Sequence, residues 1–486
     1  MQKSLLKNAI YKIALNFFNL IVPVIIGAYV YRTLGRDAIG SVKLGETIFN
    51  YFFIFASFGI YQYGLREVSR IKNDRQKVAR LFTSLFTFSL LTNIVTLATY
   101  LAVSFLGYGE KALFPILMVY AINFFLNIFY VEWVNEAFED FGFITAKTMI
   151  VKLIYVGLLL TLVKSSDDYL MFVGLLVLST GLNNFISFIY VKRRIKFDFS
   201  EISFRPHLKP LFLVVIFSNA NILYTQLDRF MLGELVDEKS VSYYTLAQQI
   251  TTMINAIMLS IIQVTIPRLS FLLGGEDDEQ YLKLLKKIAK IYSAFLFPAA
   301  IGLYVISDLG VRVYGGREYL DAGPVLAMFS LYMITLGFES ILSNQVIYIK
   351  KKENILVRFI FVGGLANLLL NFTLLQLGML DAKTAILTTA IANFILIACE
   401  YVYIRKFLQI PLQLWSWTNF KYLVYSLLFI PVSLVIRSFV SGTIWLFILI
   451  IATCIIMYVI ILWLTKDEII ILITNKIKEK FSRRRK

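Results

Sequence analysis

The segment TIWLFILIIATCIIMYVIILWL, at residues 443–464, contains no charged side chain. A helix rises by about 1.5 Å per residue, so roughly 20 apolar residues cross the roughly 30 Å of hydrocarbon in a bilayer. Apolar windows of this length recur from one end of the chain to the other. A transmembrane β-barrel would instead alternate apolar and polar residues over strands of about ten residues. The segment therefore predicts a membrane-spanning helix, and its recurrence predicts an all-α integral membrane protein.

The composition also indicates that a bilayer is the solvent of this chain. Of its 486 residues, 58% are hydrophobic and 16% are charged, and the mean hydropathy is +0.73. A soluble fold of this length could not bury so much apolar surface. We predict fourteen transmembrane helices, at residues 8–32, 41–64, 80–105, 112–136, 143–163, 169–191, 209–233, 241–266, 285–306, 323–349, 354–376, 384–404, 419–440 and 443–464. The first lacks a signal-peptide cleavage site and is expected to be retained.

The basic residues predict the orientation of these helices. Placing the N-terminus in the cytoplasm assigns most of the 48 Lys and Arg residues to cytoplasmic ends and loops, as the positive-inside rule requires. Both termini are then cytoplasmic. This topology and anionic lipid account for the net charge of +17, so no nucleic-acid partner is expected. The main basic clusters are Arg66, Arg70, Lys72, Arg75, Lys77 and Arg80, then Lys192–Arg194, Lys350–Lys352 and Arg483–Lys486.

A polar connection at residues 191–210 divides the chain, because its prolines prevent it from spanning the membrane or continuing a helix. The turn Leu34–Gly40 after helix 1 recurs weakly as Leu232–Asp237 after helix 7. This echo marks an internal repeat, as in transporters whose halves rock around a central site, or arises from hydrophobic bias alone. We predict two pseudo-symmetric six-helix lobes, residues 1–200 (helices 1–6) and 201–406 (helices 7–12), followed by helices 13 and 14 and a basic tail (407–486).

Six passages occur in an order and spacing typical of one family of transporters. They are Leu34–Gly40, Phe58–Arg66, Leu227–Gly233, Ile266–Ser270, Val313–Ala322, and the pair Asn367 and Asn371. Through these motifs the chain resembles the Wzx-type flippases, the polysaccharide transporter branch of the multidrug, oligosaccharidyl-lipid and polysaccharide exporter superfamily. It departs from the family at two turns, where Gly378–Ala382 replaces a Gly-x-x-Gly-Ala pattern and Ser242 replaces a glycine.

The resemblance implies a function in polysaccharide assembly. It implies an alternating-access flippase that moves undecaprenyl-diphosphate-linked oligosaccharide units from the cytoplasmic to the outer leaflet, for capsule, exopolysaccharide or O-antigen assembly. The implied location is the bacterial cytoplasmic (inner) membrane. The implied partners are the lipid-linked substrate, the bilayer, a coupling proton or sodium ion, and a polymerase or other assembly proteins. No enzymatic activity, metal or cofactor is expected, and the sequence has no nucleotide-binding motif.

A flippase of this kind needs a water-filled cavity lined by cations and hydrogen-bonding groups. Polar residues recur at helical spacing on predicted helices 1, 2, 7 and 8, which we therefore expect to face one another across the cavity. The candidate substrate-binding residues are Lys12, Asn16 and Asn19 on helix 1, with Pro23 as a candidate hinge; Lys43, Asn50, Gln62 and Arg66 on helix 2; Asn221 on helix 7; and Gln248 and Asn255 on helix 8.

Several of these candidates have two interpretations. Arg66 could hold the diphosphate in its guanidinium fork or anchor a helix end at the membrane surface, and Lys12 shares this ambiguity. Asp228 and Arg229 could pair and separate as a gate, or form a static interfacial salt bridge or a turn cap. Glu339, inside helix 10, could bind a proton or sodium ion and couple transport to a gradient, or could be a structural carboxylate held between helices.

Two rival classes are less consistent with the sequence. A polymerase or glycosyltransferase would need a large outer loop with catalytic acids, and the predicted outer loops are short. The only histidine, His207, lies in the 191–210 connection, which argues against histidine chemistry inside the membrane. A multidrug exporter of the same superfamily carries amphipathic cations, which suit an acidic cavity, whereas Lys12, Lys43 and Arg66 are basic.

Overall fold

The computed structural model describes residues 5–212, 214–215, 226–274, 277–413 and 416–471, and their regular structure is entirely helical. The chain forms two compact units, residues 1–242 and 243–486. Eleven helical stretches within the described residues are long and apolar enough to cross a membrane. The prediction of an all-α, multi-span membrane protein is therefore confirmed, while the count of fourteen helices and the lobe boundary at 200/201 stay predictions.

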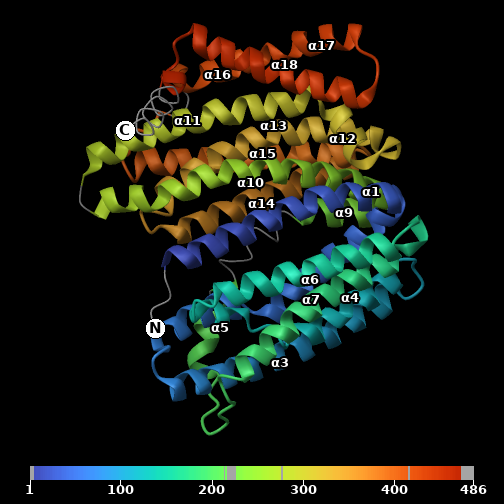
Figure 1. The fold of residues 1–486 in the computed structure, drawn as a ribbon, viewed down its shortest axis with the longest axis vertical. Helices are drawn as coiled ribbons and strands as arrows, with labels where there is room; N and C mark the ends of the chain where they lie inside the picture. The colour runs from blue at the N-terminus through green and yellow to red at the C-terminus, as the bar shows by residue number, and fades with distance from the viewer. Residues whose placement is uncertain (1–4, 213, 216–225, 275–276, 414–415, 472–486) are drawn as a thin grey trace, which may run out of the picture. The chain divides into compact units, whose positions relative to one another are not determined.

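The first unit is built from long helices that pack along their lengths. Figure 1 shows α3, α4, α6 and α7 side by side, and these helices contact one another in the order α3, α4, α7, α6. The elements are α1 (Leu5–Ser57), α2 (Ile60–Ile71), α3 (Arg75–Tyr108), α4 (Phe114–Asn127), α5 (Glu132–Ala137), α6 (Phe141–Leu162), the 3-10 turn η1 (Ser166–Asp168), α7 (Tyr169–Lys192), α9 (Leu227–Leu235) and the start of α10 (Glu238–Gly274).

Helix α1 contains both of the first two predicted spans, joined at a kink. Gly35 at the kink has φ 74° and ψ 175°, a backbone conformation that glycine adopts without the steric penalty that a Cβ would bring. Another difference concerns the predicted span 112–136, which is divided into α4 and the short α5 by the irregular residues 128–131. Apolar length identifies these spans, but it does not show where a helix bends or breaks.

An aromatic core closes the end of the first unit that we predict to be cytoplasmic. Trp133 and Phe82 are both at most 1% exposed, and their ring centroids are 6.2 Å apart. Phe197, from the connection after α7, stacks on Phe82 at 5.4 Å. The buried aromatic surface therefore holds this connection against α3.

The second unit is also a helical bundle, with its core along α11, α13 and α15. Phe297 on α11 is fully buried, and its ring packs edge-on against Phe338 of α13. Figure 1 shows α16, α17 and α18 as the last layer of this unit. Its further elements are α11 (Asp278–Val305), α12 (Ser307–Gly315), η2 (Arg317–Ala322), α13 (Gly323–Leu342), the π-turn η3 (Ser343–Ile347), α14 (Glu353–Gln376), α15 (Ala382–Lys406), α16 (Trp417–Leu427), α17 (Phe429–Phe439) and α18 (Thr443–Leu464).

The outer surfaces of both units carry large apolar side chains. Leu106 is 90% exposed in the first unit and Val264 is 78% exposed in the second. On α18 the exposed side chains include Trp445, Ile455 and Trp463. Exposure of this extent is costly in water and favourable in lipid, as expected for a protein embedded in a bilayer.

Candidate functional site

A polar face runs along the first half of α1. Lys12 and Asn16 are exposed, and Asn19 is half-buried. A polar side chain on a membrane-spanning helix is costly when it faces lipid. These three positions therefore indicate a part of the first unit that faces water rather than hydrocarbon. The Lys12 ammonium lies 5.5 Å from the ring centroid of Phe141, at the start of α6.

Helix α6 contributes a cation to this face that sequence analysis did not select. Lys152 Nζ donates a hydrogen bond of 2.6 Å to Oδ1 of Asn19. Lys152 forms no ion pair with any residue that the structure describes, and Asn19 is neutral, so the charge of the lysine is not neutralised by this contact. The useful signal in the sequence was a lysine near the middle of the predicted span 143–163, where a charge is rare unless it faces a cavity or a partner.

The other lysine of α6 has a different environment. The side chain of Lys147 is only 5% exposed, and its Nζ lies 2.9 Å from Glu132 Oε2 on α5. The same ammonium donates to Ser187 Oγ at 2.6 Å and to the carbonyl oxygen of Asn183 at 3.3 Å, both on α7. Lys147 therefore ties three helices together in a buried ion pair, and we consider it structural.

Arg66 lies on α2, close to the predicted cytoplasmic end. Its Nε donates to Oε1 of Glu67 at 2.9 Å, and its guanidinium lies 5.5 Å from the ring centroid of Tyr63. The Arg66 side chain is 51% exposed, and Gln62, one turn earlier, is also exposed. The guanidinium is accessible to a ligand, although an acidic neighbour already occupies part of its fork. Its role in binding substrate stays a prediction.

A second polar cluster forms where α1 meets α9, at the predicted outer end of the first unit. Lys43 Nζ lies 2.6 Å from Glu46 Oε2. Thr47 donates to Oε1 of Gln226 at 3.3 Å, and Arg229 donates to the same oxygen at 3.4 Å. Two predicted candidates, Lys43 and Arg229, are therefore brought into one cluster. The neighbouring candidates Asp228, which is 2% exposed, and Asn50, which is half-buried, lie on the same two helices.

Close backbone contact holds α1 against the start of α10 beside this cluster. A Cβ on Gly40 would lie 2.0 Å from the carbonyl oxygen of Glu238, so a larger residue could not occupy this position without displacing the chain. Ser41 donates a hydrogen bond to the Glu238 carboxylate. A Cβ on Gly233 would similarly lie 2.4 Å from Leu44. The echoing turns noted in the sequence thus pack against each other within the first unit.

The second unit contains the predicted coupling residue Glu339, on α13. Its carboxylate is half-buried and within hydrogen-bonding reach of Asn393 on α15. Glu400, also on α15 and 1% exposed, is near enough to interact electrostatically with Glu339. Ser343 donates to Glu400 Oε1 at 2.5 Å, while Glu400 Oε2 is buried with no hydrogen-bond partner among the described residues. Sequence analysis missed Glu400, although an acid inside the predicted span 384–404 was a usable signal.

The structure says less about the roles of the remaining candidate residues. Gln248 and Asn255 are half-buried on α10 in the second unit. Pro23 is exposed within α1, which continues through it as one helix. Asn221 lies outside the described residues, so the predicted stripe on helix 7 stays a prediction.

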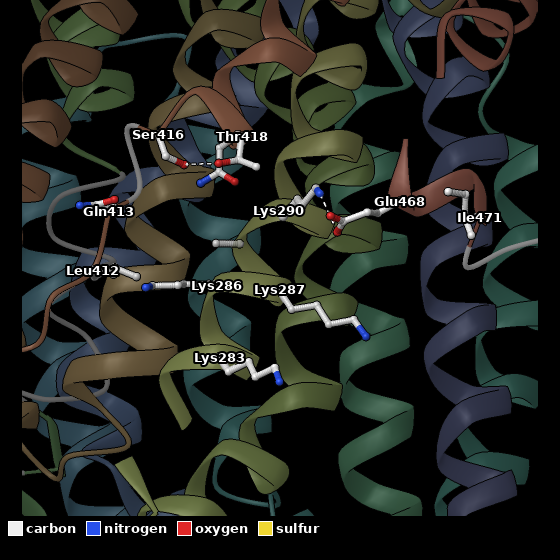
Figure 2. Close-up of a pocket in the computed structure, with 12 residues that line it drawn as sticks. Lys283, Lys286, Lys287, Lys290, Leu412, Gln413, Ser416, Thr418, Glu468 and Ile471 are labelled. Atoms are coloured by element: carbon white, nitrogen blue, oxygen red, sulfur yellow. Dashed lines mark hydrogen bonds and ion pairs between the residues drawn. The ribbon is translucent and has the colours of Figure 1, made fainter. Parts of the chain in front are cut away.

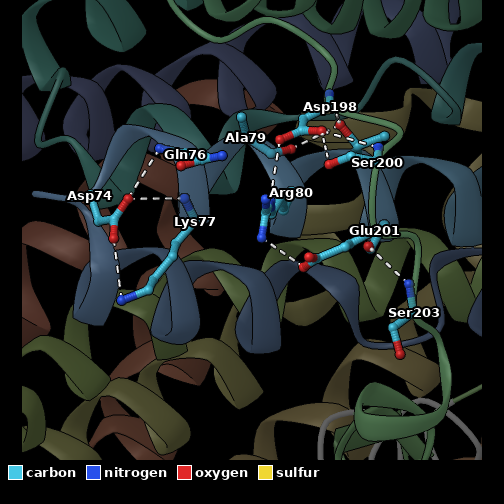
Figure 3. Close-up of polar contacts among 11 residues, drawn as sticks. Asp74, Gln76, Lys77, Ala79, Arg80, Asp198, Ser200, Glu201 and Ser203 are labelled. Carbon is cyan, nitrogen blue, oxygen red and sulfur yellow. Dashed lines mark hydrogen bonds and ion pairs between the residues drawn. The ribbon is translucent and has the colours of Figure 1, made fainter.

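Ion pairs fix the connection at residues 191–210 beside the start of α3. Arg80 lies between two acids of this connection, with Nε 3.3 Å from Asp198 Oδ2 and Nη1 2.7 Å from Glu201 Oε2, as Figure 3 shows. Hydrogen bonds from Ser200, together with the charge of Arg80, lower the pKa of Asp198. Asp74 caps α3 by accepting bonds from the backbone N–H groups of residues 76 and 77.

His207 packs against the inner side of α2. Its Nδ1 lies 2.6 Å from the hydroxyl of Tyr63, and the two rings have centroids 5.6 Å apart. Burial lowers the pKa of His207, with a smaller opposing effect of the Glu67 carboxylate. The histidine therefore joins the connection to the helix that carries Arg66.

Comparison with known proteins assigns the chain to a family. Residues 5–273, more than half of the chain, match the family described as polysaccharide biosynthesis proteins. The chain belongs to this family. Two relatives, each named "Putative O-antigen transporter", are similar over most of their length. The Shigella dysenteriae protein is 24% identical over 373 residues, which cover 76% of this chain and 92% of the relative. The Escherichia coli K12 protein is 22% identical over 380 residues, covering 77% and 91%.

Solved structures of other transporters share the fold of this family member. The lipid II flippase MurJ, in an inward closed conformation, matches with a TM-score of 0.73 and 17% identity, over 95% of this chain and 100% of MurJ. An inward-facing multidrug resistance MATE transporter matches with a TM-score of 0.58 and 16% identity, over 82% of this chain and 94% of that protein. The chain therefore has the multi-helix membrane transporter fold, and the resemblance predicted from its motifs is confirmed.

Proposed function

We propose that the protein is an alternating-access flippase for undecaprenyl-diphosphate-linked oligosaccharide units. It takes these units from the cytoplasmic leaflet of the bacterial inner membrane and releases them in the outer leaflet for assembly into capsule, exopolysaccharide or O-antigen. The family, the relatives' names and the shared fold all support this proposal.

The observation that carries the proposal is the cationic polar face of the first unit. Lys12 and Asn16 are exposed on α1, and Lys152 meets Asn19 at 2.6 Å. A diphosphate carries negative charge, and a sugar chain carries many hydroxyls, so ammonium and amide groups suit both parts of this substrate. The polyprenyl chain needs neither and can stay in lipid.

The transport cycle would use contacts already present in the first unit. The hydrogen bond from Thr47 to Gln226 and the attraction between Arg229 and Glu46, with the close approach of Gly40 to Glu238, would keep the outer end closed while substrate enters from the cytoplasm. Opening outward would separate α1 from α9 and break these contacts, so Arg229 and Asp228 would act as gate residues.

Coupling to an ion gradient would use the second unit. Glu339 and Glu400 place two carboxylates near each other inside the bundle, with Ser343 and Asn393 as neutral hydrogen-bonding neighbours. Two such groups in low dielectric favour a shared proton or a bound sodium ion over two free charges. Exchange of that ion would accompany each movement of substrate.

Export of amphipathic cations is the second candidate function, and the MATE-like fold is the observation that favours it. The basic residues of the polar face argue against it, because they would repel a cationic drug. A membrane enzyme of polysaccharide assembly is a weaker alternative, and we propose that the protein acts without catalysis, together with a polymerase and other assembly proteins.

The proposal can be tested in proteoliposomes that contain a fluorescent polyprenyl-diphosphate oligosaccharide. We expect the wild-type protein to move the lipid across the bilayer, and Lys152→Gln or Arg66→Ala to slow the movement at least tenfold. Lys164→Gln is a matched control, because Lys164 is exposed just beyond the end of α6 and its ammonium forms no ion pair with the described residues. If Lys164→Gln slowed lipid movement as much as Lys152→Gln, the polar face would no longer support the proposed function. Transport of cations without any movement of lipid-linked sugar would replace the flippase with an exporter.

A further inference from the structure

The second unit has a lysine pocket at the end of α11 that we predict to be cytoplasmic. Four lysines of this helix line a cavity of about 640 Å³. They are spaced at i, i+3, i+4 and i+7, so they share one side of α11. Figure 2 shows them along the helix, opposite the segment before α16 and the residues after α18. The lining residues are Lys283, Lys286, Lys287 and Lys290, with Gln413, Ser416, Thr418, Asn419 and Glu468 among the others.

The pocket has an excess of positive charge. Lys290 Nζ lies 2.7 Å from Glu468 Oε2, and Glu468 is the only acid among the described residues that line the cavity. Lys283, Lys286 and Lys287 are exposed and form no ion pair with any residue that the structure describes. Like charges one turn apart on a helix destabilise it unless an anion lies between them. The polar groups opposite the lysines could donate further hydrogen bonds to such an anion.

An apolar groove lies further along α11, between this helix and α18. It has a volume of about 510 Å³ and is lined by Ala294, Pro298 and Gly302 of α11 and by Ile450 and Cys454 of α18. Ala294 follows Lys290 by one turn, a rise of about 6 Å. Nearly the whole lining of the groove is apolar, so it suits a hydrocarbon chain. A Cβ on Gly302 would meet nothing within 4 Å, which shows that the groove is open at this depth.

We propose that the lysine pocket binds the phosphate head of an anionic glycerophospholipid, with one acyl chain lying in the groove along α11 and α18. A basic pocket above an apolar groove at the predicted cytoplasmic surface matches both parts of such a lipid. A soluble phosphate would account for the lysines but not for the groove. This site is separate from the polar face proposed for the oligosaccharide lipid.

The binding can be measured on the purified full-length protein without any oligosaccharide substrate, so its outcome is independent of the proposed flippase function. The apparent melting temperature in neutral detergent is followed as dioleoyl-phosphatidylglycerol, dioleoyl-phosphatidylcholine or glycerol 3-phosphate is added. We expect phosphatidylglycerol to raise the melting temperature, and phosphatidylcholine and glycerol 3-phosphate to have little effect. Stabilisation by glycerol 3-phosphate alone at the same concentration would overturn the lipid assignment and indicate a site for soluble phosphate.

Variants then locate the site. We expect Lys283→Gln, Lys286→Gln and Lys287→Gln together to raise the half-effective phosphatidylglycerol concentration at least tenfold. The control combines Lys196→Gln, Lys351→Gln and Lys352→Gln, which remove the same charge from exposed positions elsewhere. An equal loss in both triple variants would overturn the proposal, because it would show a dependence on net charge alone.

A separate variant tests the groove. Gly302→Phe would fill it from α11, and we expect a severalfold weaker response to phosphatidylglycerol with the lysines intact. An unchanged response would show that the acyl chain lies elsewhere. If the triple lysine variant does not fold, Lys286→Gln alone, compared with Lys351→Gln, provides the same comparison with one charge removed in each.

Discussion

Replacing Lys147 with methionine provides a sharp test of how the first unit is held together. The change keeps an unbranched side chain of nearly the same length but removes the only cation that pairs with Glu132 among the described residues. Both side chains are largely buried, at 5% and 14% exposure. Removing one partner of a buried ion pair costs about 3–5 kcal/mol, because the other charge is left without compensation. Glu132 keeps hydrogen bonds from Ser187 and Asn135, so we expect a loss at the lower end, about 3 kcal/mol.

The assay is the apparent melting temperature of the purified protein in detergent. At about 2 °C per kcal/mol for a large domain, the expected decrease is roughly 6 °C. Lys152→Met is the matched control on the same helix, because its partner Asn19 is neutral and the substitution leaves no buried charge behind. Loss of that single hydrogen bond should cost about 1 kcal/mol.

A double variant separates the buried charge from lost packing. Adding Glu132→Gln to Lys147→Met removes the uncompensated charge, so most of the lost stability should return. The reasoning would be refuted if Lys147→Met were no worse than Lys152→Met, or if the double variant were as unstable as Lys147→Met alone.

Three further predictions concern the gate, the connection at residues 191–210 and the two neighbouring acids Glu339 and Glu400. Gly40→Val should keep α1 away from the carbonyl of Glu238. Cysteines placed at the outer end of α1 should then be labelled faster than in the protein with Gly40. Equal labelling would show that this contact does not close the gate. Burial lowers the pKa of His207, so the stability from its contact with Tyr63 should be present above about pH 6.5 and be lost as the pH falls through the lower folded-state pKa. Unfolding scans should show that loss, and His207→Phe should remove this part of the pH dependence. Glu400→Gln should abolish the dependence of lipid movement on a proton or sodium gradient. If the variant still depended on the gradient, Glu400 would have no part in coupling.

Much of the fold follows from the sequence because a bilayer simplifies the problem. Apolar length alone predicted the helices at 143–163, 354–376 and 443–464, and each lies within a few residues of a helix in the structure. The kink at Gly35 falls in the turn predicted at Leu34–Gly40, but the break between α4 and α5 was not predicted, because it depends on local backbone conformation and packing. Irregular backbone inside the membrane is acceptable when neighbouring helices surround it, and the sequence of one helix does not reveal its neighbours.

The candidate site was predicted less completely, and the two lysines of α6 show why. Periodicity identifies stripes of polar residues, so it selected Lys12, Asn16 and Asn19 on α1 but passed over Lys147 and Lys152, which do not form a stripe. Their five-residue separation places them on different sides of α6, so one pairs with Glu132 in the interior and the other reaches Asn19 on the polar face. A lone charge inside an apolar span therefore deserves the same weight as a stripe, because the bilayer permits it only where a partner or water compensates it. The partner of such a lysine decides between a structural role and a role in binding. An acidic partner makes the lysine structural, whereas a neutral amide leaves its charge available to a phosphate.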